Sequence, residues 1–314
     1  MKKALVIRLS SAGDILITNK LIAGLKQSGY QVHLLCKEKF SQAGMAAGAD
    51  RVIKYPSSML SAASILSREN YDAVVDLQDN LRSFLLKVLV KSGYTKVYNK
   101  DTVRRRLMVL FKWFLKDTKS VSEKYLEAAA GLTPGDNAVK KKSKSSLRKK
   151  PVINVLIHDG ARWKNKRWPY FKELVKGLLK LKKVRVTLTG VKDEVDNYSP
   201  LLYHKDRRVR DLTGKTDFTG LLKEIRGADV FVGNDTAAAH AARLYEKPAL
   251  IFLGPTVQAF GFITEKDFII MENRELMCRP CDLHGGDKCP IGSFDCMKSI
   301  PPSEALQKIK KIIS

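Results

Sequence analysis

The sequence has no apolar run that approaches the ~18 residues of a membrane-spanning helix. It also lacks the apolar stretch of a secretory signal, because Arg8 follows only four apolar residues at the start of the chain. These absences predict a cytoplasmic protein. The five cysteines are therefore expected to stay reduced by default.

Acidic residues are scarce relative to basic ones. The chain has 32 Asp and Glu against 57 Lys and Arg, which gives a formal net charge of +25. This charge predicts attraction to nucleic acid, to an anionic membrane face or to phosphorylated substrates, and it does not choose among them. A hydrophobic fraction of 44% excludes disorder throughout, and 314 residues suffice for two domains.

Two common nucleotide-binding signatures are also missing. No G-x-G-x-x-G motif follows any predicted strand, so the signature of a nicotinamide or flavin site is absent. Thr213-Gly214-Lys215-Thr216 resembles the end of a P-loop, but the first required glycine is replaced by Val209. The sequence therefore gives no support to either kind of site.

Two successive alternations of strands and helices are present instead. In the first we expect strands at Lys3–Leu9, Val32–Cys36, Val52–Lys54, Ala73–Asp76 and Lys96–Tyr98, and helices at Ile15–Gln27, Met59–Arg68 and Leu81–Val90. In the second we expect strands at Val152–Ile157, Arg185–Thr189, Asp229–Val232 and Ala249–Leu253, and helices at Tyr170–Leu181, Phe218–Ile225, from Thr236, and at Ser303–Ile313 with Ser303 as its N-cap. This alternation predicts an α/β protein of two doubly wound parallel-sheet domains, residues 1–150 with a basic linker at about 136–150, and residues 151–314.

The clearest site pattern follows the predicted strand Asp229–Val232. A polar loop ends at Asp235, and a helix of small residues begins directly after it. Open α/β sheets bind ligands at the carboxyl ends of their strands. The first helical turn offers unpaired N–H groups, Thr236 adds a hydroxyl and His240 follows one turn later, so a phosphate would suit this loop. The alternatives are a helix-capping role for Asp235 and a packed core position for His240.

Three other loops follow strands. Asp14 either reaches into a cleft or caps the helix that starts at Ile15. The loop 158–169 carries four cations, which would neutralise a diphosphate or remain solvated while Trp168 packs on the domain. The loop Gly254–Thr256 is positioned to frame the same pocket as Asp235.

Two further segments leave alternatives open. Residues 102–116 combine basic and bulky apolar side chains, which is typical both of a membrane-interface segment and of an ordinary domain helix. Near the C-terminus, four thiols would form a structural zinc site, pair as disulfides or remain reduced. No partnering base points to a catalytic thiol. These four residues are Cys278, Cys281, Cys289 and Cys296.

Taken together, the ordered motifs resemble those of glycosyltransferase family 9, the bacterial lipopolysaccharide heptosyltransferases. The resemblance runs along almost the full chain, and several motifs in one order are specific where each alone is weak. It rests on Lys3–Asp14, Gly160–Pro169, Gly233–His240, Phe252–Thr256 and the tail Cys-x-Pro-Cys…Cys-Pro…Cys-Met.

The resemblance implies a GT-B fold, in which two Rossmann-like domains face each other across an interdomain cleft. The N-terminal domain would bind the acceptor, and the C-terminal domain would bind the nucleotide-sugar donor. The implied reaction is an inverting, metal-independent transfer of heptose from ADP-heptose to the inner core of lipopolysaccharide. It implies no cofactor, no nucleic-acid partner, and a cytoplasmic protein in peripheral contact with the anionic inner membrane.

The matched positions imply a role for each site residue. Asp14 would be the general base, and the donor site would comprise Lys166 and Thr236 at the diphosphate, Asp235 and His240 shaping the site, Glu194 at the ribose and Thr216 at the adenine. The family's glycine after Asp-Thr is Ala237 here, whose methyl group narrows the approach of a sugar or phosphate to the backbone. Two alternatives follow: the same fold with another nucleotide sugar, or a non-catalytic polyanion-binding protein.

Overall fold

The computed structural model describes residues 1–56, 58–90, 92–112, 119–134, 147, 150–195 and 206–314. The chain forms two compact units, Met1–Asp101 with Lys119–Lys142, and Thr102–Thr118 with Ser143–Ser314. The segment that begins at Thr102 thus belongs to the second unit, although the rest of the first unit follows it in sequence. The predicted linker at about 136–150 lies almost wholly outside the described residues, as do residues 113–116 of the basic and apolar segment.

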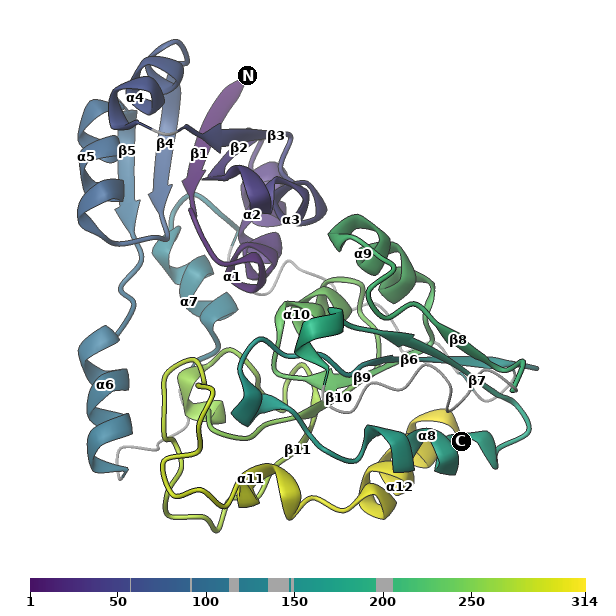
Figure 1. Ribbon diagram of the computed structural model, residues 1–314. Coiled ribbons are helices and arrows are strands. Elements are labelled where there is room, and N and C mark those ends of the chain that lie inside the picture. Colours follow the sequence, from purple (N-terminus) through teal and green to yellow (C-terminus); the bar gives the residue numbers. More distant parts are fainter. Residues whose placement is uncertain (57, 91, 113–118, 135–146, 148–149, 196–205) are drawn as a thin grey trace. The chain divides into compact units, whose positions relative to one another are not determined.

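The first unit is built on a parallel sheet with the strand order β3-β2-β1-β4-β5 (Figure 1). Its strands are β1 Lys2–Ile7, β2 Tyr30–Lys37, β3 Arg51–Tyr55, β4 Tyr71–Asp76 and β5 Ser92–Val97. The chain starts at β1, winds outward to β3 and returns to β4 on the other side of β1. Val6 consequently pairs with Leu34 on one side and Val75 on the other. The winding reverses between β1 and β4, where such sheets form their ligand crevice.

The helices of the first unit are α1 Ala12–Ile17, α2 Asn19–Gln27, α3 Ser41–Ala46, α4 Met59–Ser67, α5 Leu81–Leu89 and α7 Val121–Ala128. Residues 4–7 of β1 are completely buried, as expected for a parallel strand covered on both faces. The single helix predicted at Ile15–Gln27 was wrong, because the chain turns at Thr18. The Thr18 hydroxyl donates to the Ile15 carbonyl oxygen at 2.7 Å and helps to end α1 there.

The second unit is built on a parallel sheet with the order β11-β10-β9-β6-β7-β8 (Figure 1). Its strands are β6 Ile153–His158, β7 Val184–Thr189, β8 Val209–Asp211, β9 Val230–Asn234, β10 Ala249–Phe252 and β11 Ile269–Met271. Ile157 of β6 pairs with Leu188 on one side and Val232 on the other. The winding therefore reverses between β6 and β9. Both sheets confirm the predicted pair of doubly wound α/β halves.

The helices of the second unit are α6 Thr102–Phe111, α8 Phe171–Leu179, α9 Phe218–Gly227, α10 Ala237–Leu244, α11 Asp295–Lys298 and α12 Pro302–Ile313. The predicted N-cap of the last helix was wrong, since α12 begins at Pro302 and Pro301 occupies the N-cap position. The fixed φ of proline suits the first helical turn, where the missing N–H is not needed. Among the described residues, no helix is both long and apolar enough to cross a membrane.

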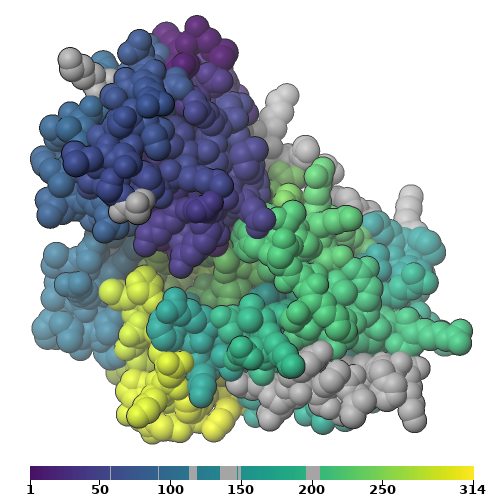
Figure 2. Space-filling model, turned by 45° about the horizontal axis from the view of Figure 1, so that its top comes forward, coloured from purple at the N-terminus to yellow at the C-terminus, as the bar shows by residue number. Residues whose placement is uncertain are grey.

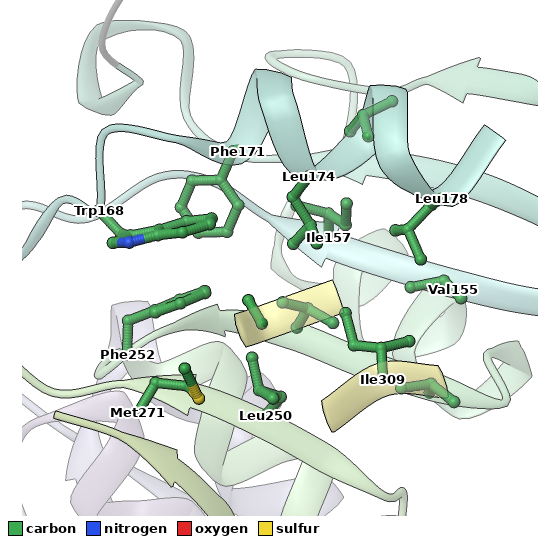
Figure 3. Packing of buried hydrophobic residues seen from close by; sticks show 14 of the residues in the cluster. Val155, Ile157, Trp168, Phe171, Leu174, Leu178, Leu250, Phe252, Met271 and Ile309 are labelled. Atoms are coloured by element: carbon green, nitrogen blue, oxygen red, sulfur yellow. The ribbon is translucent and has the colours of Figure 1, made fainter. Parts of the chain in front are cut away.

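Trp168 is a buried residue of the core of the second unit and lies at one end of the cluster, beside Phe171 and Phe252 (Figure 3). Its indole stacks on Phe252 of β10, with ring centroids 3.9 Å apart and an interplanar angle of 10°. Phe171 of α8 meets both rings edge-on. The indole N–H donates to the Ile300 carbonyl oxygen at 3.0 Å, just before α12. Trp168 thus joins a sheet strand, α8 and the C-terminal segment, and it anchors the loop that precedes it.

Candidate active site

Asp14 lies in the first unit, in the short helix that follows β1. One carboxylate oxygen, Oδ1, lies 2.8 Å from Nη2 of Arg8. The other, Oδ2, accepts hydrogen bonds from the backbone N–H and the hydroxyl of Ser11, at 2.9 and 2.8 Å. Ser11 is the N-cap of α1 and Asp14 is its third residue, so the alternative of Asp14 as N-cap is wrong. The carboxylate is held at the carboxyl end of β1 by three groups.

The loops after β1 and β4 are joined by buried polar contacts. The Arg8 guanidinium donates to the Leu77 carbonyl oxygen at 2.5 Å, and Gln78 accepts from the backbone N–H of Leu9 at 3.0 Å. Asp76, at the end of β4, is buried and accepts from the backbone N–H of Gln78 at 2.8 Å. The Arg8–Asp14 pair therefore stands at the point where the first sheet reverses its winding.

The pKa of Asp14 reflects two opposing effects. Burial disfavours the carboxylate, but the charge of Arg8 and the hydrogen bonds from Ser11 outweigh it and lower the pKa below its ordinary value. Asp14 is consequently ionised at neutral pH. An ionised carboxylate can accept a proton from a hydroxyl group, as a general base must.

A second polar cluster lies in the second unit, after β6, β9 and β10. Lys166, in a 3₁₀ turn at Lys164–Lys166, places its Nζ 2.6 Å from Oδ2 of Asp235 and 3.3 Å from the Asp235 carbonyl oxygen. Thr256, in the loop after β10, donates its hydroxyl to the same Oδ2 at 3.0 Å. The structure thus brings together three loops that the sequence placed at strand ends, including the one with Thr256.

Asp235 is held in its charged form by this cluster. Burial opposes ionisation, but the charge and hydrogen bond of Lys166, the charge of His240 and the Thr256 hydroxyl lower its pKa. The side chains of Lys166 and Asp235 are each only 11% exposed, so this is a largely buried ion pair. An ammonium group has three donors, and the contacts of Lys166 within the described residues are the two to Asp235, which leaves one N–H for a ligand.

The helix α10 begins at this cluster. Thr236 is its N-cap, so the alternative of Asp235 as N-cap is wrong. The Thr236 hydroxyl is buried and has no hydrogen-bond partner among the described residues. His240 is buried one turn into the helix, and Ala237 adopts ordinary helical geometry without a positive φ. A helix N-terminus, an unused hydroxyl and an ammonium group together favour an anionic ligand.

Two asparagines that the sequence analysis did not name as site residues support the lysine loop. Asn234 is fully buried; its side chain accepts from the backbone N–H of Trp168 at 3.1 Å and donates to the Asp159 carbonyl oxygen at 2.8 Å. Asn165 exchanges two hydrogen bonds with the backbone of Gly286. The sequence signal for these two asparagines is that each directly precedes a predicted site residue, Lys166 or Asp235.

Glu194 follows β7 and Thr216 follows β8. Both strands lie on the far side of β6 from β9, where the winding reverses. The backbone N–H of Ala161 donates to the Glu194 carbonyl oxygen at 3.2 Å, which places Glu194 beside the loop after β6. Thr216 directly precedes Asp217, the N-cap of α9. Both residues are half-buried at the carboxyl edge of the sheet. No side-chain contact among the described residues joins either of them to the pair Lys166–Asp235.

The five cysteines are free thiols. Cys278, Cys281 and Cys289 line a cavity of about 290 Å³ together with Lys112 and Val109. Burial raises the pKa of Cys296 to about 11. Within the part of the chain that the structure describes, no three or more His, Cys, Asp or Glu side chains are arranged to hold a metal ion.

Both polar clusters thus occupy the ligand-binding edge of a doubly wound sheet. The model of glycosyltransferase family 9 (heptosyltransferase) matches residues 59–282, which contain every residue of the second polar cluster. The chain belongs to glycosyltransferase family 9. Membership in this family makes it a glycosyltransferase and confirms the resemblance that the ordered motifs indicated.

Sequence relatives agree with this family. Lipopolysaccharide heptosyltransferase 1 of Escherichia coli K12 is 25% identical over 284 residues, which cover 81% of this chain and 88% of that enzyme. Lipooligosaccharide heptosyltransferase 2 of Campylobacter jejuni is 26% identical over 112 residues. That second match covers 36% of this chain and only 34% of the Campylobacter enzyme.

Solved family 9 structures show the fold. The E. coli heptosyltransferase WaaC with ADP-2-deoxy-2-fluoro heptose gives a TM-score of 0.70 at 20% identity, covering 98% of this chain and 99% of its own. The family 9 enzyme of Veillonella parvula gives 0.73 at 16% identity, covering 99% and 97%. The two parallel-sheet units of this family 9 chain therefore have the GT-B fold.

Proposed function

We propose that this family 9 enzyme is an inverting, metal-independent heptosyltransferase, which moves heptose from ADP-heptose to the inner core of lipopolysaccharide. The observation that carries the proposal is the cluster of Lys166, Asp235 and Thr236 at the N-terminus of α10. We assign donor binding to the predicted domain 151–314, which lies in the second unit. We assign acceptor binding to the predicted domain 1–150. A cytoplasmic location with peripheral membrane contact belongs to the same proposal.

Asp14 is proposed as the general base. Its ionised carboxylate takes the proton of an acceptor hydroxyl, while that oxygen forms a bond to the anomeric carbon of the donor. The bond from that carbon to the diphosphate oxygen breaks in the same displacement, and ADP leaves with the electron pair. Because attack and departure occur on opposite faces of the sugar, the configuration inverts.

The second cluster is proposed to hold the diphosphate as it leaves. The free N–H of Lys166, the Thr236 hydroxyl and the N–H groups of the first turn of α10 all favour negative charge. Asp235 and His240 shape this site: Asp235 fixes the ammonium, and His240 lies buried one turn along α10. Glu194 is assigned to the ribose and Thr216 to the adenine.

The test of the base is a pair of aspartate variants. In an assay of ADP release with ADP-heptose and purified core acceptor, Asp14→Asn should lose at least about a hundredfold in turnover, since general-base catalysis contributes ~10²–10⁴-fold. Asp72→Asn is the matched control. Asp72 lies near the amino end of β4, far from the carboxyl ends of the strands, and its carboxylate accepts a hydrogen bond from the backbone N–H of Lys3. Full turnover in Asp14→Asn would refute the base assignment.

Metal independence has its own test. The ammonium of Lys166 and the N-terminus of α10 supply the positive charge that a divalent cation would otherwise bring to the diphosphate. ADP release should therefore be unchanged by EDTA. Loss of turnover with EDTA and its recovery with Mg²⁺ would contradict this part of the proposal.

The identity of the sugar depends on Ala237, which directly follows the N-cap of α10. Its methyl group favours a second candidate, the same enzyme with a different nucleotide sugar. A thermal-shift panel of ADP, UDP and GDP sugars separates the two, because only a bound ligand raises the apparent stability. Stabilisation by a UDP or GDP sugar in preference to ADP-heptose would replace the proposed donor.

A further inference from the structure

Helix α5 of the first unit exposes an apolar strip to solvent. Its inward face buries Ser83 and Leu86. The outward face carries large apolar side chains, with Leu81 75% and Val88 64% exposed. The full strip, here called the α5 strip, consists of Leu81, Phe84, Leu85, Val88 and Leu89. These positions are three, four, seven and eight residues from Leu81, so they form one continuous face of the helix.

Basic residues border the α5 strip. At about 100° per residue, the strip covers roughly 140° of the helix, and Arg82 and Lys87 lie at its two margins. The Lys87 ammonium lies 5.1 Å from the ring centroid of Phe84, within the strip itself. The segment 81–100 contains five basic residues and no acidic one. Cations beside an apolar face are typical of helices that lie in a membrane interface.

Helix α6 repeats this arrangement in the second unit. Its inward face packs on the domain: Met108 lies in a buried cluster with Phe260, and the Arg105 guanidinium lies 4.9 Å from the ring of Phe262. Figure 2 shows the α6 segment in blue beside the yellow C-terminal chain, where Lys112 donates to the Cys278 carbonyl oxygen at 3.0 Å. The sequence left a domain helix and a membrane-interface segment as alternatives. The packing of the inward face shows that α6 is a helix of the domain.

The outward face of α6 is again apolar. Val103 is 72% exposed and Leu110 is 70% exposed. The full strip, here called the α6 strip, consists of Val103, Leu107, Leu110 and Phe111. At about 100° per residue, Arg104 and Arg106 lie at its two margins. Two helices within one stretch of 31 residues, 81–111, therefore share an exposed apolar strip with basic borders.

We infer that the α5 and α6 strips dock the enzyme on the surface of an anionic bilayer. The inference rests on the proposed function, since it deepens the membrane contact that a lipopolysaccharide acceptor requires. The apolar side chains enter the boundary between headgroups and acyl chains, while the basic borders meet anionic headgroups. Neither helix crosses the bilayer.

Charge favours a bilayer over a second copy of the chain. In a twofold dimer the same patch meets itself, so the basic borders of each strip would face like charges. An anionic lipid surface supplies the opposite charge along the whole strip. The overall charge of +25 adds long-range attraction to the same partner.

Flotation with lipid vesicles tests the inference. The wild-type enzyme should bind vesicles of equal parts phosphatidylcholine and phosphatidylglycerol, and bind pure phosphatidylcholine weakly. Phe84→Gln with Val88→Gln, and Val103→Gln with Leu110→Gln, should each lower partitioning about tenfold or more, because binding scales with buried apolar area. Arg82→Gln with Lys87→Gln should lower it about fivefold per residue, and added salt should do the same.

The matched control is Met45→Gln with Met277→Gln. These two exposed apolar residues lie outside both strips, one in each unit, and the pair should bind vesicles like the wild type. Vesicle binding that is equal in wild type and strip variants overturns the inference. A second outcome also overturns it: light scattering shows that the wild type is a dimer and the strip variants are monomers, and the wild type does not bind vesicles.

A soluble acceptor separates this inference from the proposed function. ADP release with deacylated core oligosaccharide needs no bilayer, so strip variants should keep wild-type turnover. If the wild type uses this acceptor but does not bind vesicles, only the docking inference fails. If the wild type shows the expected vesicle pattern but no transfer, only the proposed function fails.

Discussion

Removing the ammonium of Lys166 should destabilise the second unit strongly. The Lys166 Nζ and the Asp235 carboxylate are 2.6 Å apart, and each side chain is only 11% exposed. At an effective dielectric constant of about 20, two charges at that distance attract by ~6 kcal/mol before desolvation is subtracted. In Lys166→Met, Asp235 keeps the hydrogen bond from Thr256. Breaking a buried pair in this way costs ~3–5 kcal/mol, or a Tm lower by roughly 10 °C for a domain of this size.

The double variant Lys166→Met with Asp235→Asn separates stability from catalysis. It leaves no unpaired charge, so it should regain most of the lost Tm. It also lacks the proposed contact to the donor diphosphate, so turnover should stay low. Tryptophan fluorescence follows the unfolding of this unit, because Trp163 and Trp168 both lie in it.

The stabilities of the wild type and of Lys166→Met should change with pH in opposite directions. In the wild type the fold lowers the pKa of Asp235, so its contribution is present above the ordinary carboxyl pKa of 3.8 and is lost as pH falls below it. In Lys166→Met, burial should instead raise this pKa, and the variant should become relatively more stable as pH falls. Equal Tm values for Lys166→Met and wild type at neutral pH, or no recovery in the double variant, would refute the reasoning.

Three other variants address the remaining interactions. Arg8→Gln should move the acid limb of the kcat/KM–pH profile to higher pH, because the Arg8 charge lowers the pKa of Asp14; an unshifted limb would contradict the pairing. Trp168→Ala should lower the free energy of unfolding by ~3–5 kcal/mol in urea titrations, since it removes a buried ring from the core, and Trp168→Phe should cost less. Ala237→Gly should strengthen binding of the nucleotide sugar in calorimetry while lowering stability by at most ~1 kcal/mol; weaker binding would show that the methyl group does not limit the site.

The sequence predicted the loops of the candidate site better than the contacts inside them. Apolar runs ending at polar loops placed Lys166 and Asp235 after strands, because a buried parallel strand leaves a clear pattern and its carboxyl end is where ligands bind. Asp14 also follows a strand, but it lies inside α1 and not in the loop before it. The pair of doubly wound sheets followed from the same alternation. The role of each residue stays a prediction.

Other features depend on contacts between distant residues and left no local pattern. Asn234 supports Trp168 through a hydrogen bond across 66 positions, and no local propensity encodes such a partner. The Arg8–Asp14 pair could not be read from spacing, because it joins a residue just after β1 to one inside α1. The short strands β8 and β11 have three residues each, which is too few to show a period.

The hydrogen bond from the Trp168 indole to Ile300 has a consequence for synthesis on the ribosome. It joins the lysine loop to a residue 132 positions later, immediately before the last helix. A nascent chain that has not yet released this segment lacks one side of the core around Trp168. Since a domain folds as a unit once its contacts are available, the loop that holds Lys166 should become ordered only after the segment around Ile300 has left the ribosome. Until then the core around Trp168 lacks one of its sides, and Lys166 is not held beside Asp235.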